Sequence, residues 1–228
     1  MDLSLLEKSA LFHGVPVADI RAALEETPHH VRQYEKGEVV FRLLESAERV
    51  GVVLRGRVEA QKSFPNGSQV NVSVRGPGAL IGPAAAFAKN RRYPCDMVAL
   101  EPVSLLLLWR EDLLRLMQRD ERVLENVTTE VASATYMLQQ RVELLSYSGI
   151  AQKAAFWLLT QARQSGTNRV RIPGTMTDWA LRMNVSRPSL YRELRRLEER
   201  AVLRCAPPFI EIRDAAALQA LLSETRRG

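Results

Sequence analysis

Residues 185–194 read VSRPSLYREL, and they contain the clearest structural signal in the 228-residue sequence. The pattern predicts a short helix that begins after Ser186, because the serine hydroxyl can accept a hydrogen bond from an early backbone amide. Pro188 falls in the first turn of this helix, where no backbone donor is required. Leu190 and Leu194 are four residues apart and therefore share one face, which we expect to point inward.

Another short helix is predicted immediately upstream. We expect it to cover residues 178–183, with Thr177 as its N-terminal cap. Asn184 fits the tight turn between the two helices, since asparagine adopts left-handed backbone geometry more easily than most residues. The two segments together predict a helix-turn-helix, and the apolar pattern of residues 203–212 predicts a small β-hairpin wing after it.

The outward face of the helix after Ser186 is basic and polar. Residues 150–228 hold 14 Lys and Arg against 7 Asp and Glu, a net charge of +7, whereas residues 1–149 carry −1. A basic surface favours a polyanion, and the N-terminal turns of such a helix can read base edges while arginines hold phosphates. A solvated face balanced by nearby glutamates is an alternative that charge alone leaves open. The candidate DNA-binding residues are Thr177, Ser186, Arg187, Pro188, Ser189, Tyr191, Arg192 and Arg195.

A long helical segment is predicted over residues 110–145, which contain neither glycine nor proline. Apolar positions repeat along it at intervals of four or three, which is typical of a helix that pairs with another helix. An alternative is that this face packs on its own subunit, since every amphipathic helix must bury one face. Residues 147–149 interrupt the pattern and predict a hinge. The expected dimer seam consists of Val127, Val131, Ala134, Leu138, Val142 and Leu145.

The first half of the sequence predicts short helices followed by an antiparallel β-domain. A glycine and a proline divide residues 3–24 into short helical pieces. From about residue 31 to residue 109, apolar residues alternate in short runs separated by glycines, apart from a small helix around residues 83–87. The clearest turn is Pro65-Asn66-Gly67, because Asn and Gly both tolerate positive φ. The sequence therefore predicts an α+β protein with an N-terminal β-roll or barrel.

Composition excludes several classes of protein. There is no run of about 18 uninterrupted apolar residues and no basic, apolar leader, so we expect a cytoplasmic protein without a membrane partner. The two cysteines, Cys95 and Cys205, form no CxxC pair and suggest no disulfide framework. The motifs HExxH and GxSxG and a phosphate-binding glycine loop are missing, so an enzyme is not expected. The alternative to a DNA-binding regulator is an effector-binding module that acts on a protein partner, which would leave the basic helix without a role.

Four motifs give the sequence a resemblance to a known family. They are residues 34–38 (YEKGE), 54–58 (LRGRV), 76–82 (GPGALIG) and 185–194 (VSRPSLYREL). In this order they resemble the Crp/Fnr transcription regulators over nearly the full chain. The resemblance implies a sensor domain with a double-stranded β-roll, similar to a cyclic-nucleotide-binding domain, then a dimerisation helix and a winged helix-turn-helix DNA-binding domain. The corresponding residue ranges are 1–109, 110–148 and 149–228.

The same resemblance implies a homodimer that binds a palindromic operator in double-stranded DNA and contacts RNA polymerase, as an activator or a repressor. Arg187 and Arg192 match positions at which the family contacts DNA. Pro188 stands where several relatives carry a base-reading glutamate, so the operator of those relatives is not assumed.

The predicted sensor departs from the cyclic-AMP-binding members of the family. Those members use a Gly-Glu-Leu triplet for the ribose and an Arg-Ser pair for the cyclic phosphate, where this chain has Gly82-Pro83-Ala84 and Tyr93-Pro94. Leu138 and Gln139 replace the hydroxyl pair that would contact adenine. The charge-assisted contacts to a cyclic phosphate are missing, so we expect an effector other than cyclic AMP. The expected effector pocket contains Ile81, Gly82, Pro83, Ala84, Arg92, Tyr93 and Leu138.

The iron-sulfur cluster of the Fnr branch is not expected, because it requires several cysteine thiolates near the N-terminus. Tyr93-Pro94 and residues 187–190 are similar to a branch that includes the hybrid-cluster-protein regulators, which respond to nitrosative stress and in some members use haem. Haem is therefore a candidate cofactor for a sensor whose effector is otherwise unknown. The candidate axial ligands are His13, His29, His30 and Cys95, and an ordinary surface or core role is the alternative for each.

Overall fold

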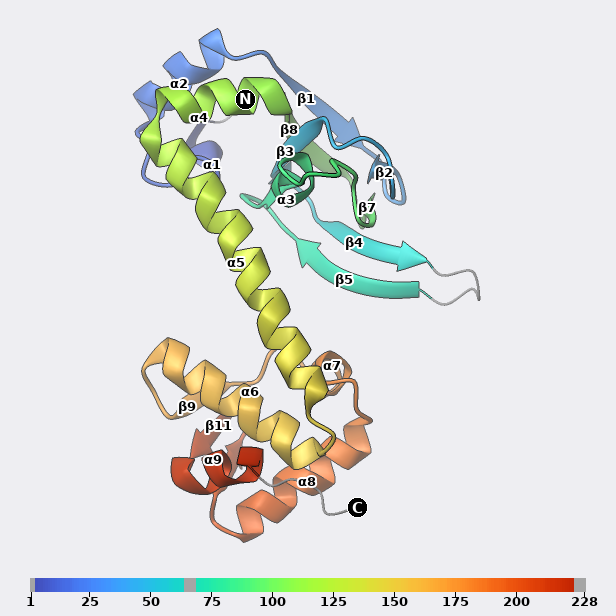
Figure 1. The fold of residues 1–228 in the computed structure, drawn as a ribbon, viewed down its shortest axis with the longest axis vertical. Helices are drawn as coiled ribbons and strands as arrows, with labels where there is room; N and C mark the ends of the chain where they lie inside the picture. The colour runs from blue at the N-terminus through green and yellow to red at the C-terminus, as the bar shows by residue number, and fades with distance from the viewer. Residues whose placement is uncertain (1–2, 64–68, 224–228) are drawn as a thin grey trace. The chain divides into compact units, whose positions relative to one another are not determined.

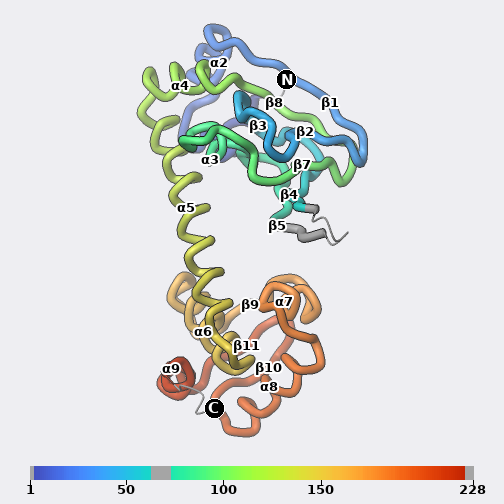
Figure 2. Tube along the Cα trace, turned by 45° about the vertical axis from the view of Figure 1, so that its right-hand side comes forward, coloured from blue at the N-terminus to red at the C-terminus, as the bar shows by residue number. Residues whose placement is uncertain are grey.

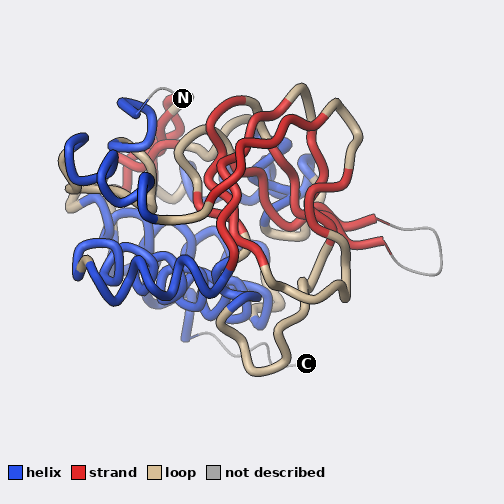
Figure 3. Tube along the Cα trace, turned by 90° about the horizontal axis from the view of Figure 1, so that it is seen from above, coloured by secondary structure: helices blue, strands red, loops and turns tan. Residues whose placement is uncertain are grey.

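The computed structural model describes residues 3–63 and 69–223. The chain divides into two compact units, Met1–Thr135 and Tyr136–Gly228, and the boundary falls within helix α5 (Glu121–Ser146). Figure 1 labels most of the helices and strands, Figure 2 shows the Cα trace from another side, and Figure 3 separates helices from strands by colour. Among the described residues, no helix combines the length and the apolar character that a membrane crossing requires.

Two antiparallel four-stranded sheets form the β-part of the first unit, as far as the structure describes it. Their strand orders are β1-β8-β3-β6 and β2-β7-β4-β5. The strands are β1 (His29–Tyr34), β2 (Val39–Phe41), β3 (Arg49–Arg55), β4 (Val58–Ser63), β5 (Gln69–Arg75), β6 (Leu80–Ile81), β7 (Asp96–Ala99) and β8 (Val103–Trp109). The predicted antiparallel β-domain is confirmed. The predicted turn Pro65-Asn66-Gly67 lies outside the described residues, between β4 and β5, which pair with Ser63 opposite Gln69.

Strand β8 shows why the two sheets share one domain. Successive side chains of a strand point to opposite faces of its sheet. Leu105 and Leu107 pack in the cluster that contains Phe41 and Tyr93, whereas Leu106 and Leu108 pack in a cluster with the helices of the first unit. All four leucines are buried, so β8 separates two apolar cores. The core that contains Tyr93 supports the pocket described below.

The helices of the first unit are α1 (Leu3–Glu7), α2 (Val17–Glu26), α3 (Pro83–Ala86), α4 (Arg110–Arg119) and the first part of α5. The prediction of one uninterrupted helix over residues 110–145 is wrong, because the chain forms two helices there. The break is at Asp120, whose backbone is extended and whose carboxylate accepts a hydrogen bond from the backbone amide of Arg122 at 2.9 Å. Because Asp120 caps the start of α5, it ends α4 without a glycine or a proline at the break.

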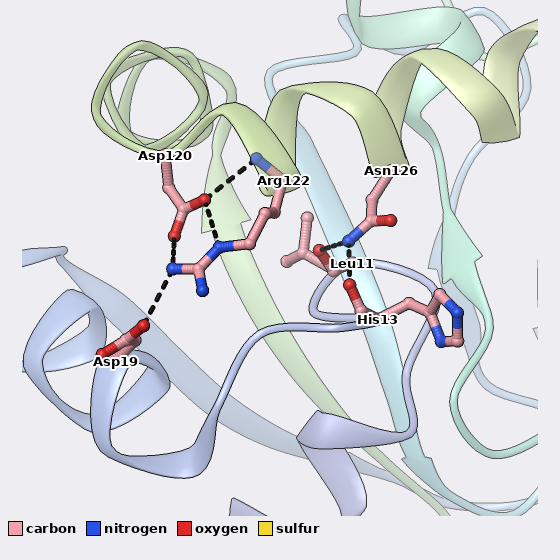
Figure 4. A network of polar contacts seen from close by, with 6 residues as sticks. All are labelled: Leu11, His13, Asp19, Asp120, Arg122 and Asn126. Carbon is pink, nitrogen blue, oxygen red and sulfur yellow. Dashed lines mark hydrogen bonds and ion pairs between the residues drawn. The ribbon is translucent and has the colours of Figure 1, made fainter.

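The start of α5 is attached to the N-terminal segment by a network of polar contacts (Figure 4). The guanidinium Nη2 of Arg122 lies 2.8 Å from the Asp19 carboxylate on α2. The side-chain amide of Asn126 donates to the backbone carbonyl oxygens of Leu11 and His13 at 3.1 and 2.9 Å. These contacts fix the beginning of α5 within the first unit.

The second unit contains the remainder of α5 and a helix-turn-helix next to a small sheet. Its elements are α6 (Ile150–Ser165), β9 (Arg169–Arg171), α7 (Met176–Arg182), α8 (Arg187–Glu199), β10 (Leu203–Ala206), β11 (Phe209–Ile212) and α9 (Ala215–Ser223). The strand order is β10-β11-β9, and all pairs are antiparallel. The predicted wing is confirmed as β10 and β11. The third strand, β9, was not predicted, because three residues give too little periodicity to recognise.

The first helix of the helix-turn-helix begins earlier than predicted. Thr175, not Thr177, caps α7, and its Oγ1 accepts a hydrogen bond from the backbone amide of Asp178 at 3.1 Å. The Asp178 carboxylate accepts in return from the backbone amide of Thr175 at 2.8 Å. This reciprocal pair satisfies two amides that the helix itself leaves unpaired, so the prediction that Thr177 caps the helix is wrong.

The turn and the second helix follow the prediction. Asn184 has φ 53°, the left-handed geometry that the turn requires. Ser186 caps α8, and its hydroxyl accepts a hydrogen bond from the backbone amide of Ser189 at 3.2 Å. Pro188 lies in the first turn, where its missing amide hydrogen costs nothing.

Candidate functional site

Helix α8 has one buried and one exposed face. Leu190, Leu194 and Leu197 are buried in the core of the second unit. Ser189 is half-buried, whereas the exposed face presents a proline, an aromatic ring and three guanidinium groups. The exposed residues of the first turns are Arg187, Pro188, Tyr191, Arg192 and Arg195. Such a face can insert side chains between the walls of a DNA groove without unpacking the core.

A chain of hydrogen bonds joins the cap of α8 to one of these arginines. The hydroxyl of Ser186 donates to the hydroxyl of Ser189 at 2.8 Å. The guanidinium Nη2 of Arg192 donates to the same Ser189 hydroxyl at 3.2 Å. The contact uses one of the five N–H groups of Arg192 and leaves the others available for a base edge or a phosphate.

Acidic partners lie toward the other end of α8. Arg196 is 3.4 Å from Glu193, and Arg195 is 3.5 Å from Glu199. Within the described residues, Arg187 and Arg192 form no ion pair with a carboxylate. In the later turns of the helix, nearby glutamates therefore balance the arginines, as the alternative of a solvated face predicts. The first turns keep uncompensated positive charge, which suits a polyanion.

A pocket of about 150 Å³ lies in the first unit, between the strands and α5. Of the seven predicted pocket residues, Ile81, Gly82, Pro83, Ala84 and Tyr93 line it. Arg92 and Leu138 lie outside the lining. The guanidinium of Arg92 instead donates to the backbone carbonyl of Leu44 at 2.7 Å, and Leu138 belongs to the part of α5 that follows the first unit.

Further residues that were not predicted as pocket residues also line the pocket. Ser73 and Arg75 come from β5 and share one of its faces, since residues two apart on a strand point the same way. Glu130 and Ala134 come from α5 and are one helical turn apart. The further residues of the lining are Phe41, Leu80, Ala85, Pro94, Cys95 and Met97.

Tyr93 is a rigid part of the pocket wall. Its ring is stacked on Phe41, with 4.4 Å between the ring centroids and 4° between the planes. Its hydroxyl donates to the backbone carbonyl of Arg49 at 2.7 Å. Burial raises the pKa of Tyr93 to about 12, because a phenolate would lose its hydration there. Gly82 has φ +86°, and a Cβ at this position would lie 3.2 Å from the Phe41 ring.

Models of two protein domains match the chain, the cyclic nucleotide-binding domain over residues 31–120 and the Crp-like helix-turn-helix domain over residues 152–221. The chain belongs to the Crp/Fnr family. The members of this family are transcription regulators and not enzymes, and the protein is accordingly a Crp/Fnr-type DNA-binding regulator. The match to a DNA-binding domain disfavours the alternative of a module that acts only on a protein partner.

Proteins that are similar to this one align with most of its length. The cyclic AMP receptor protein of Thermus thermophilus is 28% identical over 214 residues, which cover 94% of this chain and 97% of that protein. The crystal structure of the Thermus thermophilus catabolite activator protein is 27% identical with a TM-score of 0.56, covering 94% of this chain and 99% of that one. FixK2 from Bradyrhizobium japonicum is 20% identical with a TM-score of 0.55, covering 87% and 99%, and this likeness shows a shared fold alone.

The candidate haem ligands of this Crp/Fnr protein are not brought together. His13 and His30 are exposed, and the Nδ1 atom of the partly buried His29 lies 2.9 Å from the backbone carbonyl of Thr27. Cys95 lines the pocket, and burial together with the neighbouring Asp96 raises the pKa of its thiol. The part of the chain that the structure describes contains no group of three or more His, Cys, Asp or Glu able to hold a metal ion.

The predicted dimer seam of this Crp/Fnr protein divides into a buried and an exposed part. Val127 is 2% exposed and packs in a core of the first unit, as the alternative of packing on the same subunit requires. Val131 and Ala134 are partly buried. Leu138 and Val142 are each 63% exposed, and the last member of the seam, Leu145, is 43% exposed.

Proposed function

We propose that this Crp/Fnr regulator is an effector-controlled homodimer that binds a palindromic operator through the first turns of α8. The exposed basic face of α8, in a chain that matches a Crp-like helix-turn-helix domain, is the observation that carries the proposal. We assign sensing to residues 1–109, dimerisation to residues 110–148 and DNA binding to residues 149–228. RNA polymerase is the proposed further partner, through which the bound dimer activates or represses.

The proposed dimer forms along the later part of α5. Leu138, Val142 and Leu145 are apolar, exposed and spaced at intervals of four and three, so they lie on one stripe of the helix. A contiguous exposed apolar stripe favours association, and a second copy of the same helix offers a complementary one. A dimer also supplies the two recognition helices that the half-sites of a palindrome require, about 34 Å apart.

The proposed effector is neither cyclic AMP nor an iron-sulfur cluster. Cyclic AMP appears in the name of the Thermus thermophilus relative, but here Pro83 and Ala84 line the pocket where the family resemblance would place ribose-binding side chains. Tyr93 and Pro94 take the positions expected for the phosphate contacts, and the Tyr93 hydroxyl is bonded to the backbone. A ligand that binds the folded state raises the melting temperature by mass action, so a thermal-shift screen with cyclic AMP, haem and small metabolites tests this part.

Haem fits the lining of the pocket poorly and is not the effector that we propose. The pocket contains no histidine among its lining residues, and Cys95 is the one candidate ligand there. Haem iron binds a thiolate, and a raised thiol pKa disfavours that form. Addition of haem to the purified protein should therefore leave the Soret band at the position of free haem.

The proposed switch couples the pocket to α5. Glu130 and Ala134 line the pocket from α5, so an effector there contacts the β-domain and the helix that continues into the dimer stripe. A change in the pairing of α5 would reach α6 through the predicted hinge at residues 147–149. Gly149 has an extended backbone and directly precedes α6. A small rotation at this hinge alters the spacing of two recognition helices and thus the affinity for a palindrome.

The test of the proposed function begins with selection of an operator from a randomised duplex library by the purified protein. Arg192→Ala should weaken binding to the selected operator by about 1 to 3 kcal/mol if Arg192 reads a guanine, and weaken binding to unrelated duplexes less. Arg163→Ala is the matched control, because Arg163 lies near the end of α6 and its guanidinium contacts Gln219.

Three outcomes bear on the proposal. Equal losses on all duplexes would reduce Arg192 to a phosphate contact. Selection of a single half-site by a monomer would contradict the homodimer. Failure to enrich any sequence, with and without candidate effectors, would favour the module that acts on a protein partner.

A further inference from the structure

Lys153 is a buried lysine in the first turns of α6. It is 9% exposed, although lysine is among the residues least often buried. Its Nζ donates to the backbone carbonyl oxygen of Met183 at 3.2 Å. An ammonium group that loses its hydration needs such a partner, so the contact accounts for how the charge is tolerated.

The acceptor belongs to the turn of the helix-turn-helix. Met183 is the C-terminal cap residue of α7, where unpaired carbonyls carry partial negative charge. Asn184 follows in left-handed geometry, and the amide of Val185 donates back to the Ala180 carbonyl at 3.0 Å. The carbonyl held by Lys153 is therefore three residues before Ser186, the residue that caps the recognition helix.

Helix α6 holds α7 at a second point, one turn further along. The rings of Trp157 and Trp179 are tilted by 50° with 4.7 Å between their centroids. Residues 153 and 157 are four apart and share one face of α6. The polar contact to the turn and the aromatic contact to α7 therefore come from the same face of α6.

We propose that Lys153 is a positioning residue, which fixes the turn before α8 and thereby sets the direction in which α8 presents Arg187 and Arg192. The inference rests on the DNA-binding function of the helix-turn-helix. The contact stabilises the fold, because the Met183 carbonyl would otherwise lack this donor. The ammonium also determines where the carbonyl of the turn lies, and the test separates this effect from stability.

The test compares K153M, K153L and K153R with the parent protein. Met and Leu keep an apolar side chain without the ammonium group. K153L is included in case K153M does not fold. Each protein is titrated with its selected operator and with a scrambled duplex of equal length, at several salt concentrations and well below the melting temperature. R163M is the matched control, since it removes a positive charge from the exposed end of the same helix.

We expect K153M and K153L to lower the ratio of operator affinity to scrambled-duplex affinity by about tenfold, the loss of roughly one base contact from a misdirected helix. The slope of affinity against salt should stay close to the parent value, because no phosphate contact is lost. The melting temperature should fall somewhat, because the Met183 carbonyl loses its donor. K153R should recover part of the ratio, and R163M should leave it unchanged.

A parent-like ratio in K153M and K153L would overturn the inference, whatever happens to the melting temperature, because Lys153 would then be structural only. An equal loss on both duplexes with a smaller salt slope would overturn it as well, since Lys153 would be acting as a phosphate contact. If the parent protein itself prefers no sequence, the DNA-binding function fails first, and the inference falls with it.

Discussion

Ser189 accepts a hydrogen bond from Arg192, with 3.2 Å between the serine hydroxyl and Nη2 of the guanidinium. The same hydroxyl accepts from Ser186, the cap of the helix. Arginine has a large conformational entropy when its side chain is free, and one fixed N–H group removes part of it before DNA binds. In the proposed DNA-binding function, Ser189 therefore preorganises Arg192 from a half-buried position.

Ser189→Ala should lower the affinity for the selected operator by about 1 kcal/mol, because the arginine must then be ordered by the DNA alone. The backbone amide of Ser189 still donates to the cap, so the helix should remain as stable as before. Fluorescence anisotropy with labelled operator measures the affinity, and a thermal melt measures the stability. Ser189→Thr keeps a hydroxyl and serves as the control. Parent-like affinity in Ser189→Ala would mean that the contact does not help to order Arg192.

Thr175→Ala should lower the free energy of unfolding by about 1 kcal/mol, because the amide of Asp178 loses its acceptor. The Asp178 carboxylate accepts hydrogen bonds from the backbone and side chain of Thr175, which hold its pKa below the usual range. A lowered carboxyl pKa stabilises the folded state above the usual pKa, and this contribution is lost as the pH falls through the lowered value.

Thr177→Ala is the matched control, since Thr177 is exposed and does not cap the helix. Urea unfolding at pH 7 and at successively lower pH should show a deficit for Thr175→Ala that narrows in acid. A larger loss of unfolding free energy in Thr177→Ala than in Thr175→Ala would indicate that Thr177 caps α7, as the sequence predicted.

The two caps of the helix-turn-helix show what a sequence can and cannot predict. The cap of α8 was predictable because Ser186 and Pro188 are a local signal that needs no distant partner. The cap of α7 was mispredicted, although Thr175 has Asp178 three residues later, at the spacing of a capping box, whereas Thr177 has Ala180 there. The choice depends on Gly174, whose φ of +77° lets the Asp178 carboxylate occupy the space that a Cβ would fill. Backbone geometry of this kind is not visible in the residue pattern.

Helix α5 shows the same limit at the level of packing. Periodicity predicts that a face is buried, but it does not say against which partner. Val127 and Leu138 belong to one repeat in the sequence, and yet Val127 packs in its own unit while Leu138 is exposed. The pocket was predictable only in part for a similar reason. Gly82 lies in a recognisable motif and Tyr93 at a position that the family resemblance indicates, whereas Arg75 and Glu130 come from segments that only the fold brings to the pocket.

Tyr93→Phe should lose about 1 kcal/mol of stability at neutral pH, since the Arg49 carbonyl loses its donor. The folded-state pKa of Tyr93 is raised to about 12, so the neutral hydroxyl contributes stability below pH 10 that is lost as the pH rises toward 12. Phenylalanine has nothing to lose over this range. The difference in unfolding free energy between the two proteins should therefore shrink above pH 10 in urea titrations, and a constant difference would show that the hydroxyl is not protected from ionisation.

Leu138→Glu should convert the proposed dimer to monomer. Leu138 is 63% exposed in the single chain, so a charge there costs little in the monomer, whereas in a paired helix it would be buried opposite its own copy. Thr129→Glu is the matched control. Thr129 lies nine residues before Leu138, which places it on the opposite side of the helix from the stripe, and it is also exposed. Sedimentation velocity should show a smaller species for Leu138→Glu alone, with affinity for the palindrome reduced to that for a single half-site. If both variants remain dimeric, the subunits pair through another surface, and the stripe of α5 has a different partner.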